Sequence, residues 1–269
     1  MDYDTMGVLI FILGILIGSF LNAFIYRIPR GIKISTGRSQ CTHCHKELKW
    51  YELVPVFSYI FLRGKCSGCG EKISILYPIT ELLTGVLYLF THLIFGFQIE
   101  FFIYVLTITV MIPIIRIDYE HKYIPDRLNL SILVLGLIYT IHQAFTDLNI
   151  LWINGLGFLI GALIIFIVRW IGQQIYKREA MGFGDLKLLA ALGMLIGWQG
   201  VIFTFLIGCI IASIIEVTLI AVKVKQRDSE IAFGPYLVYA AIIYMFFGET
   251  LINFYMDLLG GVLYAVLHL

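Results

Sequence analysis

Long apolar runs constrain the fold of this chain more than any other feature of its sequence. Of the 269 residues, 60% are hydrophobic and only 14% are charged, whereas ordinary soluble domains carry about 25% charged residues. A helix needs ~20 largely apolar residues to cross a bilayer. Apolar runs lie at 8–26, 77–95, 100–117, 128–145, 150–171, 186–198, 201–222 and 233–248. The sequence therefore predicts an all-α polytopic membrane protein with about eight transmembrane helices.

One of these segments is shorter than a bilayer is thick. As a helix, 186–198 would be ~20 Å long, and the hydrocarbon core of a bilayer is ~30 Å thick. The segment fits either a thin span or one half of a re-entrant hairpin with 201–222. Both alternatives leave the basic residues around these segments on the same side.

The basic residues predict which side of the membrane each connection faces. All 19 Lys and Arg residues lie in or at the edges of the connections after the first, third, fifth and seventh segments, and the positive-inside rule places these in the cytoplasm. Asp2 and Asp4 precede the first segment, and Arg27 and Arg30 follow it. This order is the reverse of a secretory signal and predicts an uncleaved anchor with its N-terminus outside. We expect the tail 251–267 to lie as an interfacial helix on the outer surface, with the C-terminus outside.

Four of the five cysteines fall in the largest predicted soluble piece, residues 27–76, which separates an anchor at 1–26 from a polytopic domain at 77–269. They form two C-x-x-C pairs, Cys41 with Cys44 and Cys66 with Cys69. Four thiolates at such spacings are typical of a structural zinc site. The reducing cytoplasm disfavours disulfides, and a domain of ~50 residues gains stability from a bound metal. The pattern predicts structural zinc, with redox chemistry as the weaker alternative.

Other potential metal ligands have simpler explanations. His43 lies inside the first C-x-x-C pair and His45 directly follows it, but four cysteines already fill a tetrahedral shell. We therefore interpret both histidines as loop residues. Cys209 lies inside an apolar segment, and we interpret it as a packing residue.

Two aspartates mark the ends of apolar segments. Asp118 follows the run that closes at 117, and Asp185 opens the run that begins at 186. The charge pattern predicts that both lie at the cytoplasmic boundary, where ionisable groups are costly and usually functional. Two carboxylates at one site can act as general base and general acid, which suggests hydrolysis without a metal or a covalent intermediate. Glu81 and Glu216 lie within segments near the same boundary, either snorkelling or serving the site.

Structural roles for these carboxylates are also open. Asp185 could cap the helix that follows it, since Asp is a preferred N-cap residue. Asp126 follows a proline and precedes an apolar run, so we interpret it as an N-cap. Asp118 has no such role, because an acid near a helix C-terminus opposes the helix dipole. Arg116 or Lys122 could nevertheless neutralise it.

The motifs together resemble those of the bacterial type IV prepilin peptidases, which are G-x-G-D aspartyl membrane proteases. The resemblance covers most of the chain. It rests on Gly18-Ser19-Phe20-Leu21-Asn22, the two C-x-x-C pairs, Arg63-Gly64-Lys65-Cys66, Tyr77-Pro78 through Glu81, Asp118 through Asp126, Gly182-Phe183-Gly184-Asp185 and Phe233-Gly234-Pro235-Tyr236. Ala232 departs from the proline of many members, which affects only a local turn.

The resemblance implies an activity, substrates and a cofactor. It implies that Asp118 and Asp185 form the catalytic pair, and that the enzyme removes the basic leader of type IV prepilins or pseudopilins after a glycine at the cytoplasmic membrane face. It further implies N-methylation of the new N-terminus with S-adenosylmethionine, although no G-x-G-x-x-G follows a strand, so the residues that bind the methyl donor stay unassigned. The tetracysteine loop is linked in the family with that second activity.

Two other classes of protein remain as alternatives. A transporter or membrane scaffold would usually show internal repeats and polar groups near the midplane, and this sequence shows neither. A protease resembling presenilin or signal peptide peptidase would leave the tetracysteine loop unexplained. The lipid bilayer and a pilin substrate are thus the expected partners. The sequence indicates no nucleic-acid partner and gives no oligomeric state.

Overall fold

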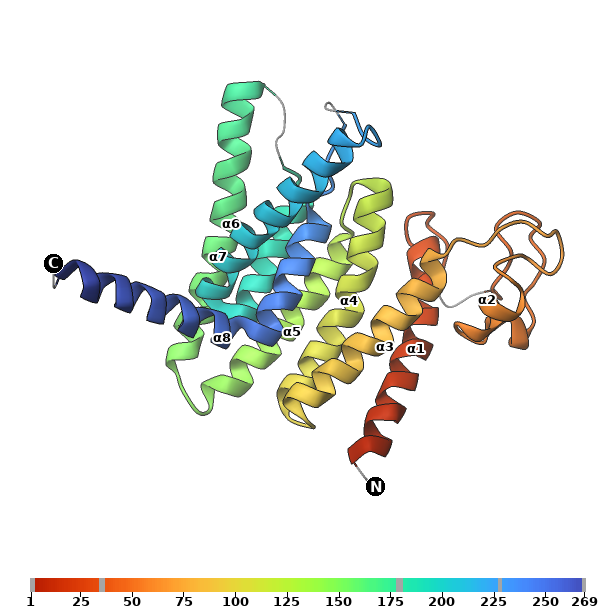
Figure 1. The fold of residues 1–269 in the computed structure, drawn as a ribbon, viewed down its shortest axis with the longest axis horizontal. Helices are drawn as coiled ribbons and strands as arrows, with labels where there is room; N and C mark the ends of the chain where they lie inside the picture. The colour runs from red at the N-terminus through yellow and green to blue at the C-terminus, as the bar shows by residue number, and fades with distance from the viewer. Residues whose placement is uncertain (1–2, 34–36, 178–180, 227–228, 268–269) are drawn as a thin grey trace. The chain divides into compact units, whose positions relative to one another are not determined.

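The computed structural model describes residues 3–33, 37–177, 181–226 and 229–267, and this part of the chain is built from helices (Figure 1). The long helices are α1 (Tyr3–Arg27), α3 (Leu76–Phe95), α4 (Ile99–His121), α5 (Asp126–Ala144), α6 (Asn149–Tyr176), α7 (Phe183–Ala221) and α8 (Gly234–Leu267). Between α1 and α3 lie a short 3-10 helix, η1 (Trp50–Leu53), and a short α-helix, α2 (Phe57–Phe61). In the described residues, strand pairing amounts to two isolated bridges. The all-α prediction is confirmed.

Six helices of the described residues are long and apolar enough to cross a membrane: α1, α3, α4, α6, α7 and α8. The predicted segment 128–145 is helical as α5, but polar residues such as Asn129 and Thr140 interrupt it and it is not among the six. The segments 186–198 and 201–222 both belong to α7. The tail 251–267 continues α8. The structure therefore supports a polytopic membrane protein with six candidate spans, and the count of eight is not confirmed.

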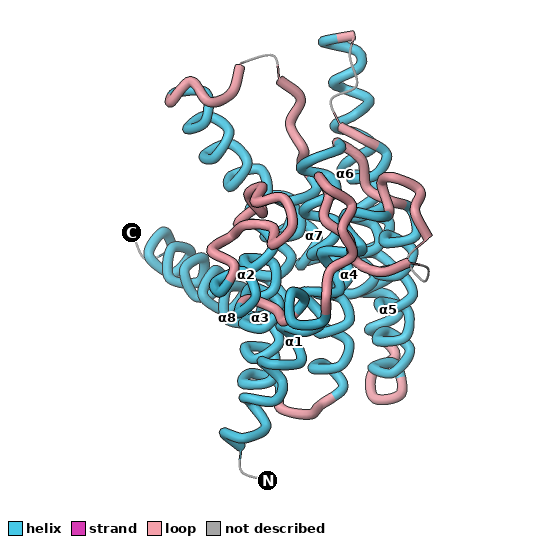
Figure 2. Tube along the Cα trace, turned by 90° about the vertical axis from the view of Figure 1, so that its right-hand side faces the viewer, coloured by secondary structure: helices cyan, strands magenta, loops and turns pink. Residues whose placement is uncertain are grey.

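The chain divides into two compact units, residues 1–121 and 122–269. The first contains α1, α3, α4 and the segment between α1 and α3, which is mostly loop (Figure 2). The second contains α5 to α8. The predicted division into 1–26, 27–76 and 77–269 follows expected membrane boundaries rather than compactness, and it stays a prediction.

In the first unit, α1 and α3 touch through small residues. A Cβ atom on Gly14 would lie 2.7 Å from the Cα of Gly85, and one on Gly18 would lie 2.7 Å from the Cα of Glu81. Gly14 and Gly18 form a G-x-x-x-G pattern, which lets helix backbones approach closely in a membrane. This contact positions the carboxylate of Glu81 directly against α1.

In the second unit, α6 and α7 pack backbone against backbone. A Cβ on Gly161 would lie 2.5 Å from the carbonyl oxygen of Leu189, and one on Gly193 would overlap the carbonyl of Gly157. Gly157 and Gly161 are again four residues apart on one helix face. The absence of side chains at these positions brings the two helices together.

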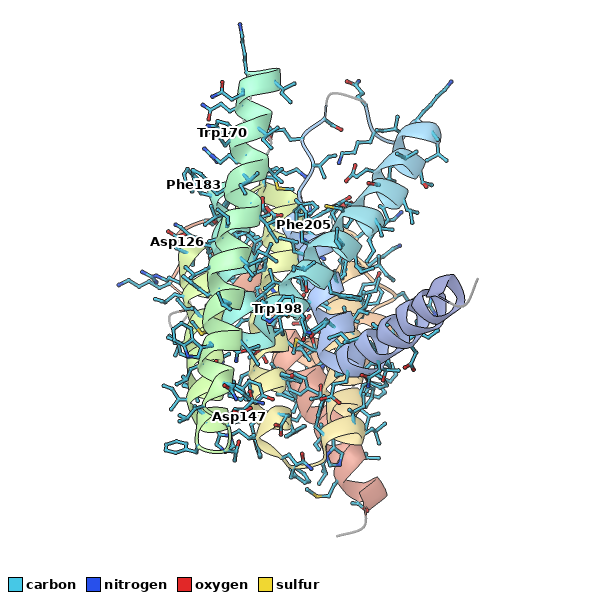
Figure 3. All side chains as sticks on the ribbon, turned by 90° about the vertical axis from the view of Figure 1, so that its left-hand side faces the viewer. Asp126, Asp147, Trp170, Phe183, Trp198 and Phe205 are labelled. Carbon is cyan, nitrogen blue, oxygen red and sulfur yellow. The ribbon has the colours of Figure 1, made fainter. Side chains whose placement is uncertain are left out.

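Helix α7 is not one straight rod. Its 39 residues would extend about 58 Å as a straight helix, roughly twice the thickness of a bilayer core. Gly197 breaks it with φ 71° and ψ 177°, in a region of backbone space that suits glycine. Figure 3 shows Trp198 well inside the length of the second unit, between the level of Phe183 and that of Asp147. We call residues 183–196, the part of α7 before the break, the first arm. This arm ends part-way along the second unit, which favours the re-entrant alternative for 186–198.

Polar side chains fasten the turning point of α7. The Oγ1 of Thr140 in α5 donates to the carbonyl oxygen of Met194 at 2.9 Å. The Nδ2 of Asn154 in α6 donates to the same Thr140 oxygen, also at 2.9 Å. Thr140 and Asn154 are both buried, and a buried polar group needs a partner. The end of the first arm is thus fixed by both neighbouring helices.

Candidate functional site

Four cysteine side chains from two loops meet in the first unit. The Sγ atoms of Cys41, Cys44, Cys66 and Cys69 all lie within 4.8 Å of one another. The Sγ atoms of Cys41 and Cys69 are 4.0 Å apart, and so are those of Cys44 and Cys66. Both separations are too long for a disulfide of ~2.05 Å. Tetrahedral zinc with Zn–S bonds of about 2.3 Å would hold its sulfurs about 3.8 Å apart. The cluster could therefore hold a metal ion with little rearrangement.

The two cysteine loops share one backbone design. The carbonyl oxygen of Cys41 accepts a hydrogen bond from the His45 amide at 3.0 Å, and that of Cys66 accepts one from the Gly70 amide at 2.9 Å. His45 and Gly70 both adopt left-handed φ values, 56° and 73°. His45 thus serves as a turn residue. Among the described residues, the four cysteines are the one group that could hold a metal, and it includes neither His45 nor His43.

The backbone around Cys66 favours the thiolate form of its side chain. Cys66 is buried, and the Gly68 amide donates to its Sγ at 3.4 Å. Hydrogen bonds from the backbone amides of Cys69 and Gly68 lower the pKa of Cys66 to about 6. The thiolate is the form that binds metals, so the Cys66 side chain is prepared to bind a cation.

A buried carboxylate, Glu52, joins the two cysteine loops. It accepts hydrogen bonds from the Lys49 amide at 2.7 Å, from the Lys46 ammonium at 3.1 Å and from the Ser67 hydroxyl. Lys46 follows the first cysteine pair, and Ser67 lies inside the second. The Lys49 amide, the Ser67 hydroxyl and Lys46 lower the pKa of Glu52 to about 2. Sequence reasoning missed this residue, although Glu at the third position of a short helix is a capping signal.

Glu81 is buried where α1, α3 and the tetracysteine loop meet. Its Oε2 accepts the Val56 amide at 2.7 Å, and the side chains of Ser19 and Asn22 in α1 also hydrogen-bond to it. Val56 has a φ of 61°, which is strained for a β-branched residue. The carboxylate is therefore held inside the unit rather than snorkelling, and it secures a strained turn just before α2.

Asp118 lies in the last turn of α4 and is buried. The helix continues to His121, one turn beyond the predicted end at 117. Arg116, one of the two residues that could neutralise Asp118, forms an ion pair with Glu120. Tyr119, next to Asp118, is exposed. The end of α4 therefore buries Asp118 together with Ile117, while Tyr119 and Glu120 are exposed.

In the second unit, Asp185 lies buried in the first turn of α7. Its Oδ2 accepts the Gly182 amide at 3.2 Å, so it caps the helix from the third position rather than as the N-cap residue. A Cβ on Gly184 would lie 3.1 Å from the Cβ of Ile124. The Gly184 carbonyl accepts a hydrogen bond from the Asn129 amide group at 3.2 Å. The G-x-G-D loop thus packs on the chain around the start of α5.

Asp126 is not the N-cap that the sequence suggested. Helix α5 begins at Asp126 itself, and Pro125 occupies the N-cap position without a side-chain cap bond. The Oδ1 of Asp126 instead lies 2.7 Å from the Nζ of Lys187, and both side chains are exposed. The interpretation was wrong because Lys187, two residues after Asp185, reaches across from α7, and local sequence does not reveal this contact.

The motif Phe233-Gly234-Pro235-Tyr236 contacts the C-terminal part of α7 through Tyr236. Glu216 is buried and accepts the Tyr236 hydroxyl at 2.8 Å and the Lys225 ammonium at 2.7 Å. Tyr236 lies in the first turn of α8. Glu216 therefore holds α8 against α7 as a paired carboxylate and does not snorkel.

Comparison with known proteins shows that this polytopic membrane protein is an integral membrane peptidase. Residues 12–95 match the bacterial peptidase A24 N-terminal domain, and residues 101–217 match the type IV leader peptidase family. The chain belongs to the type IV leader peptidase family, and it is a bacterial inner-membrane protein. No solved structure matches it.

Curated relatives cover nearly the whole chain. A protein of Legionella pneumophila is 33% identical over 89% of this chain and 90% of its own length. A protein of Stutzerimonas stutzeri is 31% identical over 91% of this chain and 92% of its own length. A protein of Xanthomonas campestris is 32% identical over 92% of this chain and 93% of its own length. Each is named prepilin leader peptidase/N-methyltransferase.

Proposed function

We propose that this protein removes the leader of type IV prepilins or pseudopilins and N-methylates the new N-terminus. The similarity to relatives of that name over 89% or more of the chain carries the proposal. The burial of Asp118 and Asp185 at the ends of candidate spans supports it. Ionisable groups in such places are expensive unless they serve a function.

In this proposal Asp118 and Asp185 are the catalytic pair. One carboxylate accepts a proton from water, and the resulting hydroxide attacks the carbonyl carbon of the leader glycine. The partner, in its protonated form, stabilises the developing oxyanion and then protonates the departing amine. The two acids exchange protonation states in each turnover, so we assign neither of them as the base or the acid.

The proposed site faces the cytoplasm. The one-sided distribution of Lys and Arg supports this orientation, because basic connections stay on the cytoplasmic side. Both termini then lie outside the cytoplasm. A prepilin presents its basic leader on that same side, so the scissile bond meets Asp118 and Asp185 at the membrane surface.

The metal in the proposal is structural zinc bound by Cys41, Cys44, Cys66 and Cys69. Four thiolates close the tetrahedral shell and leave no position for substrate. S-adenosylmethionine would supply the methyl group to the new N-terminal amine. Among the described residues there is no glycine-rich loop after a strand, so we assign no residue to the donor.

Purified protein incubated with a prepilin and labelled S-adenosylmethionine tests both activities. Asp118→Asn and Asp185→Asn keep the size of the side chain but cannot accept and return a proton. Each should lower leader cleavage by at least about a hundredfold, while zinc content stays at the wild-type level. Given a pre-cleaved pilin, both variants should still methylate it.

The matched control is Asp147→Asn, the same change at an exposed residue. The Oδ1 of Asp147 accepts the Asn149 amide at 2.9 Å, a role that asparagine can also fill. Cleavage should remain near wild type in this control. Wild-type cleavage in Asp118→Asn or Asp185→Asn would reject the aspartyl mechanism, and no cleavage of any prepilin by the wild type would reject the function.

A further inference from the structure

The short helix α2 turns its apolar face outward. Phe57, Ile60 and Phe61 are 61%, 63% and 81% exposed. Their spacing of three and four residues places them on one side of the helix. Leu53 and Val54, just before α2, are exposed as well. We call Phe57, Ile60 and Phe61 the α2 face.

The opposite side of α2 is anchored to the tetracysteine loop. The hydroxyl of Tyr59 donates to the Ile73 carbonyl at 3.3 Å. The Tyr59 ring also covers Gly64, where a Cβ would lie 2.9 Å from it. Because Tyr59 holds the inner side, the α2 face cannot turn inward without breaking these contacts.

The position of α2 along α3 places this face near the membrane boundary. The Val56 amide, one residue before α2, lies 2.7 Å from the Glu81 carboxylate. Glu81 is five residues after the start of α3 at Leu76, or roughly 8 Å along the helix axis. Helix α3 is a candidate span. Figure 1 shows α2 beside the end of α1 rather than beyond it.

Exposed apolar residues continue from the loop into the first turns of α3. Ile75, Leu76 and Ile79 are all exposed. Chain segments on both sides of the tetracysteine loop are thus tethered by candidate spans, α1 and α3. An apolar face at this level is surrounded by lipid unless another protein surface covers it.

The net positive charge of residues 27–76 favours contact with an anionic lipid surface. Residues 27–76 hold nine Lys or Arg and three Glu. A positive segment beside a membrane is attracted by anionic headgroups. Apolar side chains with flanking cations are the pattern of helices that lie in the membrane interface.

We propose that the α2 face docks the tetracysteine domain on the bilayer that holds α1 and α3, with anionic lipids around it. Phe57, Ile60 and Phe61 lie in the interfacial region, and the cysteine loops stay in water. The domain is thereby held at the lipid surface by a third contact in addition to its two covalent links. This inference does not depend on the proposed catalytic residues.

Tryptophan quenching in the reconstituted full-length protein tests the proposal. The native tryptophans Trp50, Trp152, Trp170 and Trp198 are replaced by phenylalanine, and a single probe is introduced as Phe61→Trp. The matched probe is Thr42→Trp, at an exposed position in the first cysteine loop. Vesicles contain phosphatidylcholine and phosphatidylglycerol with acyl chains brominated near the headgroup, and iodide serves as the aqueous quencher. Zinc content per chain verifies that both variants are folded.

Brominated lipid should quench Phe61→Trp roughly twofold or more relative to Thr42→Trp, and iodide should show the reverse order. Equal lipid quenching of both probes would overturn the assignment to α2. Quenching of Phe61→Trp by iodide alone would mean that the face is in water. Protection from both quenchers would mean that protein covers it, and this outcome too would overturn the proposal.

Discussion

The tetracysteine loop and the α6–α7 pair are built on opposite principles. Among the described residues of 27–76, the buried ones are Glu52, Gly64 and Cys66, while large apolar side chains lie on the surface. The α6–α7 pair instead brings backbone against backbone at Gly157 and Gly193. The first region depends on paired charges and, in our proposal, on metal ligation, whereas the second depends on the close fit of two helix backbones. Loss of metal or charge should therefore disturb the tetracysteine loop and spare the α6–α7 pair, whereas an added methyl group between α6 and α7 should do the reverse.

Loss of the metal should have the largest effect. Structural zinc contributes on the order of 10 kcal/mol to folding in zinc-finger peptides, and a loop with so few buried residues has little else to replace it. Cys66→Ser should lower zinc occupancy and speed limited proteolysis within 37–75, while hydrogen exchange in α6 and α7 stays unchanged. Cys209→Ser, a cysteine outside the cluster, is the control. Full zinc retention after removal of all four cluster cysteines would falsify the site.

A methyl group between α6 and α7 should disturb only the second unit. Gly193→Ala places a Cβ against the Gly157 carbonyl, and overpacking of this kind costs about 1–3 kcal/mol. Thermal unfolding in detergent should shift down while zinc occupancy holds. The control is Gly155→Ala in α6, where a Cβ would meet nothing within 4 Å. Equal stability of the two variants would contradict the close packing.

Removal of the Glu52 charge should weaken the first region by a smaller amount. The depressed pKa of about 2 means that the ionised form is favoured in the folded state. Its contribution is therefore complete above the unfolded pKa and is lost only as pH falls through the folded value. Glu52→Gln should cost about 1–2 kcal/mol, with the same difference from wild type at all pH values between about 5 and 8.

The matched control for Glu52 is Glu47→Gln. Glu47 pairs with Arg38 at 3.3 Å on the surface, where ion pairs contribute little. Chemical unfolding of zinc-loaded protein, followed by proteolysis of the loop, measures both variants. A gap between Glu52→Gln and wild type that closes on going from pH 5 to pH 8 would contradict the sign of the shift.

The smallest effect is expected at Asp126. Its exposed ion pair with Lys187 should contribute about 0.2–1 kcal/mol. Asp126→Asn should keep most leader cleavage, in contrast to the proposed pair, and Lys187→Gln should match it in stability. A loss of cleavage confined to Asp126→Asn would mean that the catalytic acid was assigned to the wrong residue.

Local sequence patterns predicted the helices and the cysteine cluster but not the long-range partners of individual side chains. The helices follow from apolar runs, and the meeting of four cysteines follows from two C-x-x-C spacings. The sequence did not predict the contacts of the Glu52 carboxylate, because its partners Lys46 and Ser67 come from the two separate cysteine loops. The same holds for Glu81, whose contact with Val56 joins residues 25 positions apart.

For the two proposed catalytic residues, Asp118 and Asp185, the sequence predicted some structural features and missed others. Their positions at the ends of apolar segments predicted that they would be unusual, and both are buried. The sequence did not show that Asp185 accepts the Gly182 amide from within the helix. It also did not show where α7 breaks, although the predicted gap after residue 198 falls next to Gly197. Glycine occurs throughout membrane helices, so its presence alone does not mark a break.

The break at Gly197 also determines how much sequence change the arm before it can accept. Asp185 lies 12 residues before Gly197, about 18 Å along the helix. Contacts at Gly193 and Met194 hold the arm at its distal end. Each residue inserted or deleted between Asp185 and Gly193 would rotate the carboxylate by about 100° about the helix axis. Substitutions in this arm can be accommodated by repacking, but a change in its length turns Asp185 away. If Asp185 is catalytic as we propose, the number of residues in the arm is itself a functional constraint.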